Sequence, residues 1–185
     1  MVKGFQYFNE TVIMVQLPYN ERERAGRNIF KRERRWNMKI ALVSDTHGIC
    51  REEFLTQIKK CDYLIHVGDF DREHVYNTLQ ELGVPMYAVR GNCDRGEWAA
   101  YLHEFLAVPI GGKMFYLVHN QMDLPYDLTD ADFIVYGHTH VFAHMERHGK
   151  VYINPGTAGQ DRGDGKSMAI LTLEDGEYHL ERVYL

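Results

Sequence analysis

The chain has 185 residues, of which 45% are apolar and 25% are charged, and its formal net charge at neutral pH is −5. This composition is typical of one folded globular domain and excludes an intrinsically disordered chain. No apolar run approaches the roughly 20 residues of a membrane-spanning helix, and no signal peptide with its cleavage site is recognisable. The three cysteines fit no paired framework, so we expect reduced thiols and a cytoplasmic location.

Charge is divided unevenly along the chain. Residues 1–37 carry eight basic and four acidic side chains, a net charge of +4, which leaves −9 for residues 38–185. Nucleic acids and other long polyanions are bound through stripes of Lys and Arg. The acidic body of the chain is therefore a poor partner for DNA or RNA.

Residues 1–37 differ from the rest because their second half is almost entirely polar and lacks an apolar stripe. One interpretation is a basic arm that binds nucleic acid or membrane lipid. We favour another, a start-site artefact, with the native protein beginning at Met38 directly before a core strand. Residues 33–36 can be encoded by GAG-AGG-AGG-TGG, which resembles a prokaryotic ribosome-binding site, and CGN codons for Arg34 and Arg35 would exclude this interpretation. We expect the functional domain to span residues 38–185.

From residue 38 the chain alternates between predicted strands and predicted helices. Short apolar runs over residues 40–43, 63–67 and 86–89 indicate buried strands, and apolar residues at helical spacing indicate helices over 51–60 and 72–82. This order is typical of parallel strands joined by right-handed crossovers. Ligands of open α/β sheets bind at the C-terminal edge of such strands.

The second half contains six further predicted strands and little helix after about residue 105. We expect strands over residues 115–118, 133–136, 141–145, 151–153, 168–173 and 178–184. Turn signals separate them at Gly111-Gly112, His148-Gly149, Gly163 to Gly165 and Asp175-Gly176. We interpret this as an antiparallel half that follows a parallel half, and we expect two packed sheets with helices outside.

Five polar clusters lie where predicted strands end. They are Asp45-Thr46-His47, Gly68-Asp69, Gly91-Asn92-Cys93-Asp94, His119-Asn120 and Gly137-His138-Thr139-His140. A single His at a strand end is more often structural than a ligand, and Gly91-Asn92 alone would be a turn. Together the clusters supply carboxylate and amide oxygens and imidazole nitrogens, which suit Mn²⁺, Fe, Zn²⁺, Ni²⁺ or Co²⁺ and argue against a thiolate site.

The order D-x-H, G-D, G-N-x-D, H and G-H-x-H resembles the calcineurin-like metallophosphoesterase superfamily, and within it the compact YfcE-type phosphodiesterases. The resemblance covers residues 38 to about 185. It implies a four-layer αββα sandwich, in which two mixed β-sheets are flanked by helices. It also implies a two-metal phosphodiesterase that hydrolyses a small phosphate diester by attack of a hydroxide bridging the two metals.

The resemblance further implies a ligand set for two divalent transition-metal ions. The implied ligands of the first metal are Asp45, His47, Asp69 and His140. Those of the second are Asp69, Asn92, His119 and His138, so that Asp69 bridges the two metals. We expect Mn²⁺ first. Ni²⁺, Zn²⁺, Fe and Co²⁺ are alternatives, because sites of Asp, His and Asn accept several metals.

Two positions depart from the family pattern. Cys93 stands where many members have a His that protonates the leaving oxygen, and a thiol with a pKa of about 8.5 is neutral at pH 7 and a poor hydrogen-bond donor. We therefore expect a preference for diesters with good leaving groups and weak activity on alkyl monoesters. Asn120 stands where a Gly often follows the His, and Asn tolerates left-handed backbone.

We assign catalytic roles to Asp69, Asn92, Cys93 and Asp94. For Asp94 the alternatives are to orient Cys93 or a ligand histidine, or to close the turn. His66 is expected to support the ligands rather than to be one of them.

Plainer roles are expected for other notable residues. We expect Cys50 and Cys61 in the core, and a structural turn at residues 154–157.

Two other functions are compatible with the same fold. One is a non-catalytic scaffold such as the small subunit of retromer, and the other is a nuclease, which the acidic body disfavours. The expected partner is a small phosphate ester, without membrane or nucleic acid, and self-association is left open.

Overall fold

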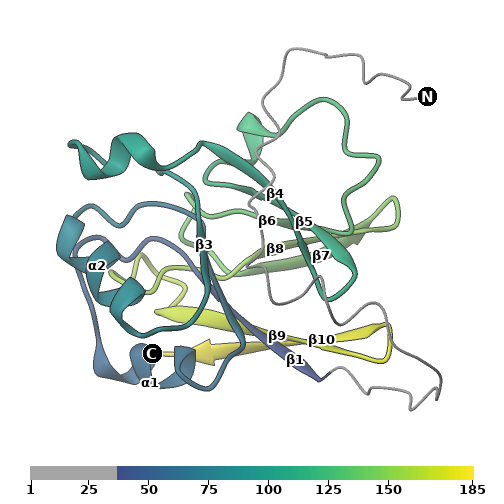
Figure 1. The fold of residues 1–185 in the computed structure, drawn as a ribbon, viewed down its shortest axis with the longest axis horizontal. Helices are drawn as coiled ribbons and strands as arrows, with labels where there is room; N and C mark the ends of the chain where they lie inside the picture. Colours follow the sequence, from purple (N-terminus) through teal and green to yellow (C-terminus); the bar gives the residue numbers. More distant parts are fainter. Residues whose placement is uncertain (1–36) are drawn as a thin grey trace, which may run out of the picture. The chain divides into compact units, whose positions relative to one another are not determined.

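The computed structural model describes residues 37–185, so the interpretation of residues 1–37 as an extension lies outside the described residues except at its last position. No helix within this described range is long and apolar enough to cross a membrane. The described chain forms two five-stranded sheets, which Figure 1 shows with β1, β9 and β10 below and β4 to β8 above.

The first sheet contains the predicted parallel unit. Its strand order is β10-β9-β1-β2-β3, formed by β1 (Met38–Val43), β2 (Tyr63–His66), β3 (Met86–Ala88), β9 (Ser167–Glu174) and β10 (Glu177–Tyr184). β1, β2 and β3 are parallel, and β9 pairs antiparallel with β1 and β10. Helices α1 (Glu52–Ile58) and α2 (Glu73–Glu81) make the two crossovers, as the apolar spacing predicts.

The second sheet is mixed rather than antiparallel, which corrects one expectation. Its strand order is β4-β5-β6-β8-β7, formed by β4 (Phe105–Ile110), β5 (Lys113–Val118), β6 (Phe133–Val135), β7 (Ala143–Arg147) and β8 (Lys150–Asn154). The Gly111-Gly112 and His148-Gly149 turns do close hairpins, but β5, β6 and β8 are mutually parallel. The reason is that a long connection carries the chain back between β5 and β6, and the antiparallel strand β7 carries it back between β6 and β8.

Strand β4 was not predicted from the sequence. Its run FLAVPI contains Pro109, and a proline lacks the N–H that an internal strand donates to its neighbours. Because β4 is an edge strand of the second sheet, one side of its backbone needs no partner strand. After β3, helix within the described residues is limited to the short 3-10 helices η3 (Trp98–Tyr101) and η4 (Gln121–Asp123).

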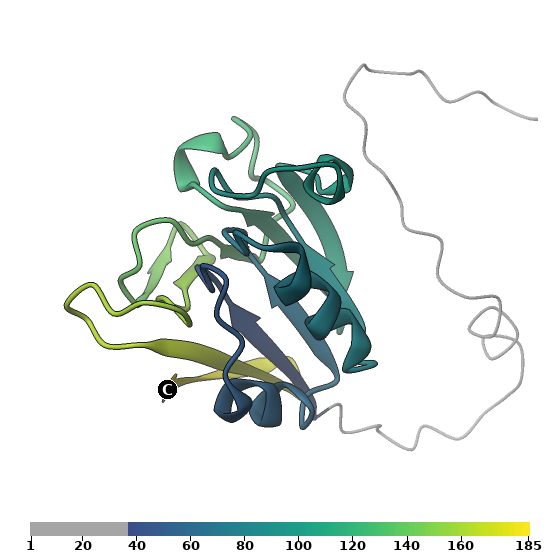
Figure 2. The same ribbon diagram turned by 90° about the vertical axis from the view of Figure 1, so that its left-hand side faces the viewer.

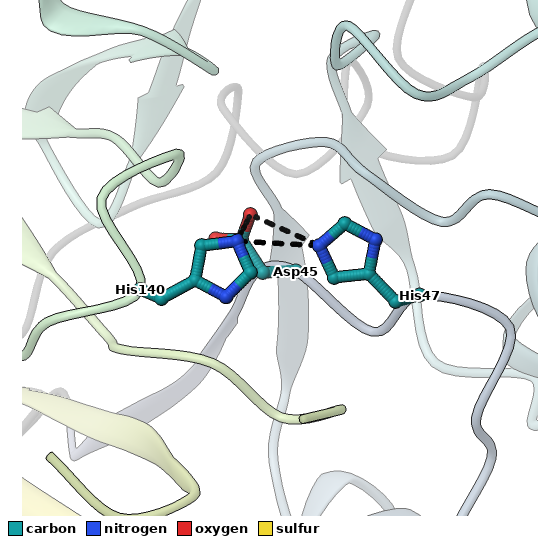
Figure 3. A group of neighbouring side chains, drawn as sticks. All are labelled: Asp45, His47 and His140. Carbon is teal, nitrogen blue, oxygen red and sulfur yellow. Dashed lines mark hydrogen bonds and ion pairs between the residues drawn. The ribbon is translucent and has the colours of Figure 1, made fainter. Parts of the chain in front are cut away.

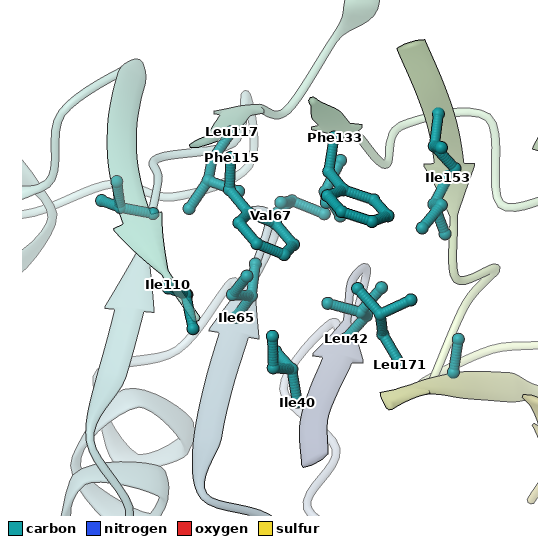
Figure 4. Packing of buried hydrophobic residues seen from close by; sticks show 14 of the residues in the cluster. Ile40, Leu42, Ile65, Val67, Ile110, Phe115, Leu117, Phe133, Ile153 and Leu171 are labelled. Carbon is teal, nitrogen blue, oxygen red and sulfur yellow. The ribbon is translucent and has the colours of Figure 1, made fainter. Parts of the chain in front are cut away.

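Two apolar clusters hold these layers together. Along β1, Ile40 and Leu42 face the second sheet, whereas Ala41 and Val43 face the helices, because successive strand residues point to opposite faces. Figure 4 shows the cluster between the sheets, where Ile40, Leu42, Ile65 and Leu171 meet Phe115, Leu117, Phe133 and Ile153.

The second cluster joins α1 and α2, which lie in front of the strands in Figure 2, to the outer face of the first sheet. Each fully buried Leu, Ile or Phe contributes about 1.5–3 kcal/mol to stability. The two sheets and the apolar cluster between them confirm the predicted sandwich of two mixed sheets. Its packed layers fix where the strand ends lie.

Candidate metal centre

All seven predicted ligands follow the C-terminal ends of parallel strands. Asp45 and His47 follow β1, Asp69 follows β2, and Asn92 follows β3 in the first sheet. His119 follows β5, while His138 and His140 follow β6 in the second sheet. The site therefore lies where the C-terminal strand ends of the two sheets come together.

Five of these seven residues have a left-handed backbone. The positive φ angles are 53° at Asp45, 45° at His47, 59° at Asp69, 67° at His138 and 62° at His140. This conformation costs a non-glycine residue about 1–2 kcal/mol, and Asp and His adopt it more readily than most. Such strain persists where the surroundings enforce it, and it is common at functional sites.

Backbone hydrogen bonds hold the strained loops against each other. The N–H of Asp45 donates to the carbonyl of Gly68 (3.1 Å), and the N–H of His47 donates to that of Asp69 (3.0 Å). A Cβ on Gly91 would overlap the backbone nitrogen and the carboxylate of Asp69, so only glycine allows these loops to approach so closely.

The first ligand group consists of Asp45, His47 and His140. Figure 3 shows these three side chains pointing toward one another, Asp45 and His47 from the loop after β1 and His140 from the loop after β6. The Nε2 atoms of the two histidines are 3.3 Å apart, and Asp45 Oδ1 lies 3.3 Å from Nε2 of His140 and 3.8 Å from Nε2 of His47. Nitrogen and oxygen ligands about 2.0–2.2 Å from one metal have mutual separations of this order.

An unpaired carboxylate oxygen in this group also fits a cation. Asp45 Oδ1 and His140 Nδ1 are buried and have no hydrogen-bond partner among the described residues. Burial raises the pKa of Asp45, against the opposing effect of a hydrogen bond from Ser44. A buried carboxylate oxygen without a partner is costly unless a cation or another donor satisfies it.

The second ligand group consists of Asn92, His119 and His138, joined by Asp69. Asn92 Oδ1 lies 3.1 Å from His119 Nε2 and 3.0 Å from His138 Nδ1. His119 Nδ1 is 2.7 Å from the carbonyl of Val67, which fixes the ring and directs Nε2 toward the centre. Asn92 and His138 are exposed, whereas His119 is buried.

Asp69 lies between the two groups. Its Oδ2 atom is 3.8 Å from Nε2 of His47 and 3.4 Å from Nε2 of His119. Its Oδ1 atom accepts the N–H of Cys93 at 2.8 Å, which holds the carboxylate in this orientation. One carboxylate oxygen is thus directed toward both groups of predicted ligands.

The pKa values reflect this concentration of charge. Burial would raise the pKa of Asp69, but the hydrogen bond and charge of His119, with the N–H of Cys93, hold it well below its usual range. Burial would lower the pKa of His119, but the Asp69 carboxylate raises it overall. For His140, burial and then the positive charges of Arg162 and His47 lower the pKa to about 4, so its ring is neutral at pH 7, as metal ligation requires.

Cys93 and Asp94 take different places beside Asp69. Burial and the neighbouring carboxylates raise the pKa of the Cys93 thiol to about 11, so the thiol is neutral. The Asp94 carboxylate accepts the N–H groups of Asp69 (3.0 Å), Gly91 (2.8 Å) and Asp71 (2.8 Å). None of these hydrogen bonds goes to Cys93 or to a histidine, so Asp94 joins the backbones of the second and third strand-end loops.

Other buried side chains support the loops. His66 is buried three residues before Asp69, stacks on Phe70 and lies 3.2 Å from the Thr46 hydroxyl through Nε2. Asn154 donates to the carbonyl of Gly137 at 2.8 Å, beside the loop that carries His138 and His140. Thr157 donates to the carbonyl of Asp45 at 2.9 Å. Cys61 is buried in the apolar core, as expected, and Cys50 is half-buried against it.

The structure adds residues that sequence patterns did not reveal. A cavity of about 450 Å³ adjoins the second ligand group, and Arg90, Glu104 and Asp123 line it together with the ligands. Arg90 directly precedes the Gly91-Asn92 cluster, and this position could have drawn attention to it in the sequence. Arg162, whose charge acts on His140, lies in a loop whose geometry the sequence does not give.

Comparisons with known proteins identify the family of the chain. The calcineurin-like phosphoesterase superfamily domain model matches residues 38–176. The probable metallophosphoesterase YsnB of Bacillus subtilis is 31% identical over 153 residues, which cover 75% of this chain and 86% of that protein. The phosphodiesterase YfcE of Escherichia coli is 25% identical over 172 residues, which cover 75% of this chain and 94% of that protein.

Solved structures show the same fold. The vacuolar protein sorting 29 structure from Cryptosporidium parvum has a TM-score of 0.65 at 21% identity and covers 81% of this chain and 98% of that one. At this identity the likeness concerns the fold alone. The family model and the relatives together confirm the resemblance predicted from the polar clusters: the chain belongs to the calcineurin-like phosphoesterase superfamily and is a metal-dependent phosphoester hydrolase.

Proposed function

We propose that the protein is a phosphodiesterase that hydrolyses a small phosphate diester with two divalent cations. The observation that carries this proposal is the position of Asp69, whose Oδ2 atom lies 3.8 Å and 3.4 Å from ring nitrogens of two separate ligand groups. A shared carboxylate is what a pair of metals about 3.5–4 Å apart requires.

Each group offers the donors that a divalent transition metal prefers. Asp45, His47 and His140 would hold one cation, and Asn92, His119 and His138 the other, with Asp69 common to both. When bound, the cations supply a nucleophile from water and neutralise the negative charge that develops on the phosphoryl oxygens. Mn²⁺ is the metal that we expect first, because the donors are carboxylate, amide and imidazole groups rather than thiolates.

The chain itself orients this chemistry. Val67 fixes the ring of His119 through its carbonyl, and the N–H of Cys93 fixes Asp69 through Oδ1. Asp94 binds the backbone of both loops that carry Asp69 and Asn92. Preorganised ligands of this kind lose little energy to reorganisation during the reaction.

Cys93 determines which leaving groups are favoured. Its thiol is neutral, because its pKa is about 11, and a thiol is a weak hydrogen-bond donor. A leaving group therefore receives little help from protonation at this position. Diesters with good leaving groups should react well, and alkyl monoesters should react poorly.

We further propose a cytoplasmic location and a small-molecule substrate rather than a nucleic acid. All three cysteines are free, which fits a reducing compartment. The net charge of −9 over residues 38–185 opposes binding of a polyanion.

A panel of aryl and alkyl phosphodiesters, monoesters and nucleotides tests the proposal, with Mn²⁺, Ni²⁺, Zn²⁺ and Mg²⁺ in turn. We expect metal-dependent hydrolysis of diesters that is lost in Asp69→Ala. Hydrolysis that persists in Asp69→Ala, or an alkyl monoester cleaved as fast as an aryl diester, would contradict the proposal. Protein that binds no divalent cation would favour a non-catalytic scaffold instead.

A further inference from the structure

The cavity beside the second ligand group has the size of a small-molecule pocket. Its volume is about 450 Å³, and small-molecule pockets are commonly about 300–1,000 Å³. Its lining includes the predicted ligands Asn92, His119 and His138 and the charged residues Arg90, Asp94, Glu104 and Asp123. A diester whose phosphoryl group lies at the ligands therefore has room for one of its two ester groups here.

The one basic side chain that lines this pocket among the described residues is paired with a carboxylate. Arg90 is the one Lys or Arg among the described lining residues, and its guanidinium is paired with the Glu104 carboxylate. The backbone N–H of Arg90 also donates to the carbonyl of His103 at 2.8 Å, which fixes the base of the side chain. The pair offers hydrogen-bond donors and acceptors but no net positive charge.

Asp123 adds a negative charge to the pocket. The Asn120 side chain accepts the N–H of Met122 at 3.0 Å, and the N–H of Asp123 donates to the Asn120 carbonyl at 2.9 Å, so the short η4 helix is held in place. The Asp123 carboxylate has no hydrogen-bond or ion-pair partner among the residues that the structure describes. The charge of Asp94, by contrast, is satisfied by three backbone N–H groups.

We propose that this pocket selects the ester group of the substrate by charge. It accepts an uncharged, hydroxyl-bearing group such as a polyol or a sugar, and it rejects a group that carries a further phosphate. Hydroxyls match the donors and acceptors of the Arg90–Glu104 pair, whereas an added phosphate meets the uncompensated Asp123 carboxylate. This inference rests on the proposed phosphodiesterase function and names its substrate class.

Two chromogenic diesters with the same leaving group test the proposal: p-nitrophenyl glyceryl phosphate and p-nitrophenyl 3-phosphoglyceryl phosphate. The Mn²⁺-loaded wild type should show a kcat/KM at least about tenfold higher for the first compound. Asp123→Asn and Glu104→Gln should each reduce this ratio by about threefold or more, since the first removes the uncompensated negative charge and the second leaves the positive charge of Arg90 unpaired. Glu81→Gln, which removes an exposed carboxylate at the end of α2, is the matched control and should leave the ratio unchanged.

Equal kcat/KM values for the two diesters in the wild type would overturn the proposal. So would a ratio that neither pocket variant changes, or that Glu81→Gln changes equally. If neither diester is hydrolysed, the proposed function fails, and calorimetry with glyceryl and 3-phosphoglyceryl methylphosphonates still decides the selectivity. Binding of the uncharged analogue at least about tenfold tighter supports it, and equal binding overturns it.

Discussion

The two ligand groups that meet at Asp69 differ in burial and in how their polar atoms are satisfied. Asp45 and His140 of the first group are buried, and each has one polar atom without a hydrogen-bond partner among the described residues. In the second group Asn92 and His138 are exposed, and the amide oxygen of Asn92 lies within hydrogen-bond distance of both histidines.

The difference indicates how much each group depends on a cation. Leaving a buried polar atom unsatisfied costs about 1–3 kcal/mol, so a cation bound at Asp45 Oδ1 would remove this cost from the first group. In the second group the Asn92 amide oxygen lies within hydrogen-bond distance of both histidines, and all three residues line the cavity. We therefore expect the first position to hold its metal more tightly, and the second to exchange its metal and to bind substrate.

Asp69→Asn should have the largest effect, because it weakens the one residue shared by both groups. We expect kcat/KM for an aryl diester to fall on the order of 10³-fold, with loss of at least one metal per chain. Asp62→Asn is the matched control, since Asp62 also accepts a backbone N–H, that of Lys39 at 2.8 Å. Full activity and two retained metals in Asp69→Asn would show that the groups do not share this carboxylate.

Asp94→Asn should have the next largest effect, through the loops that it joins. An amide has one acceptor where the carboxylate has two, so at least one of the bonds to Asp69, Gly91 and Asp71 is lost. We expect kcat/KM or metal affinity to fall about 10–100-fold. Kinetics together with metal titration check this prediction, and an unchanged metal affinity would indicate that Asp94 merely closes a turn.

Acid should destabilise the protein through His66, which contacts Thr46 in the loop that carries Asp45 and His47. Burial, with the charge of His119, lowers the pKa of His66 from 6.5 to about 3. Below pH 6.5 the unfolded chain binds a proton at His66, whereas the folded chain does not. The contribution of neutral His66 to the free energy of unfolding is therefore complete above pH 6.5 and is lost as the pH falls toward 3. Between pH 7 and pH 5 the loss should be about 2 kcal/mol.

Denaturant unfolding at several pH values measures this loss. His66→Gln should remove that part of the pH dependence, whereas His179→Gln, at an exposed position of β10, should not. An acid dependence that is the same in wild type and His66→Gln would show that His66 does not stay neutral in the folded protein.

A chelator should remove the metals of the two ligand groups at different concentrations. Stepwise titration with a chelator should remove one metal at a concentration about tenfold or more below that needed for the other, because the first group is buried and has unsatisfied atoms. Metal analysis of His138→Ala should show that the weakly held metal is the one missing. Simultaneous loss of both metals would show that the two groups do not differ in metal affinity.

Cys93→Ser should have the smallest effect. The Asp69 carboxylate accepts the backbone N–H of position 93, which Ser retains, and it also interacts with the neutral thiol, which a Ser hydroxyl replaces as a donor. We expect kcat/KM for an aryl diester to change by less than about threefold, since no proton transfer is lost. A larger loss would mean that the sulfur itself takes part, whereas Cys93→His should raise activity on alkyl monoesters.

The fold was largely predictable because its signals are local. Apolar runs and helical spacing indicated α1, α2 and most strands, and Gly-containing turns marked three hairpins. Strand β4 was missed because Pro109 weakens the strand pattern and only the tertiary structure shows that it lies at an edge. The parallel pairing of β5, β6 and β8 depends on the return of the chain after β5 and on the pairing of β7 beyond β8, which residue spacing does not specify.

The convergence of the candidate side chains was predictable from the sequence, but the surface around them was not. The sequence places Asp45, Asp69 and His140 at strand ends, and sheet geometry then brings them together. The roles of Asp94 and of the Arg90–Glu104 pair depend on contacts between loops far apart in the chain. Such contacts follow from packing, and no local pattern encodes them.

The central claim is that two cations share Asp69, and anomalous diffraction from crystals of Mn²⁺-loaded protein tests it most directly. The account predicts two manganese peaks about 3.5–4 Å apart, both within bonding distance of the Asp69 carboxylate. Asp45→Ala should remove the peak beside His47 and His140 while the fold stays intact. A single peak, or two peaks that do not share Asp69, would contradict the account.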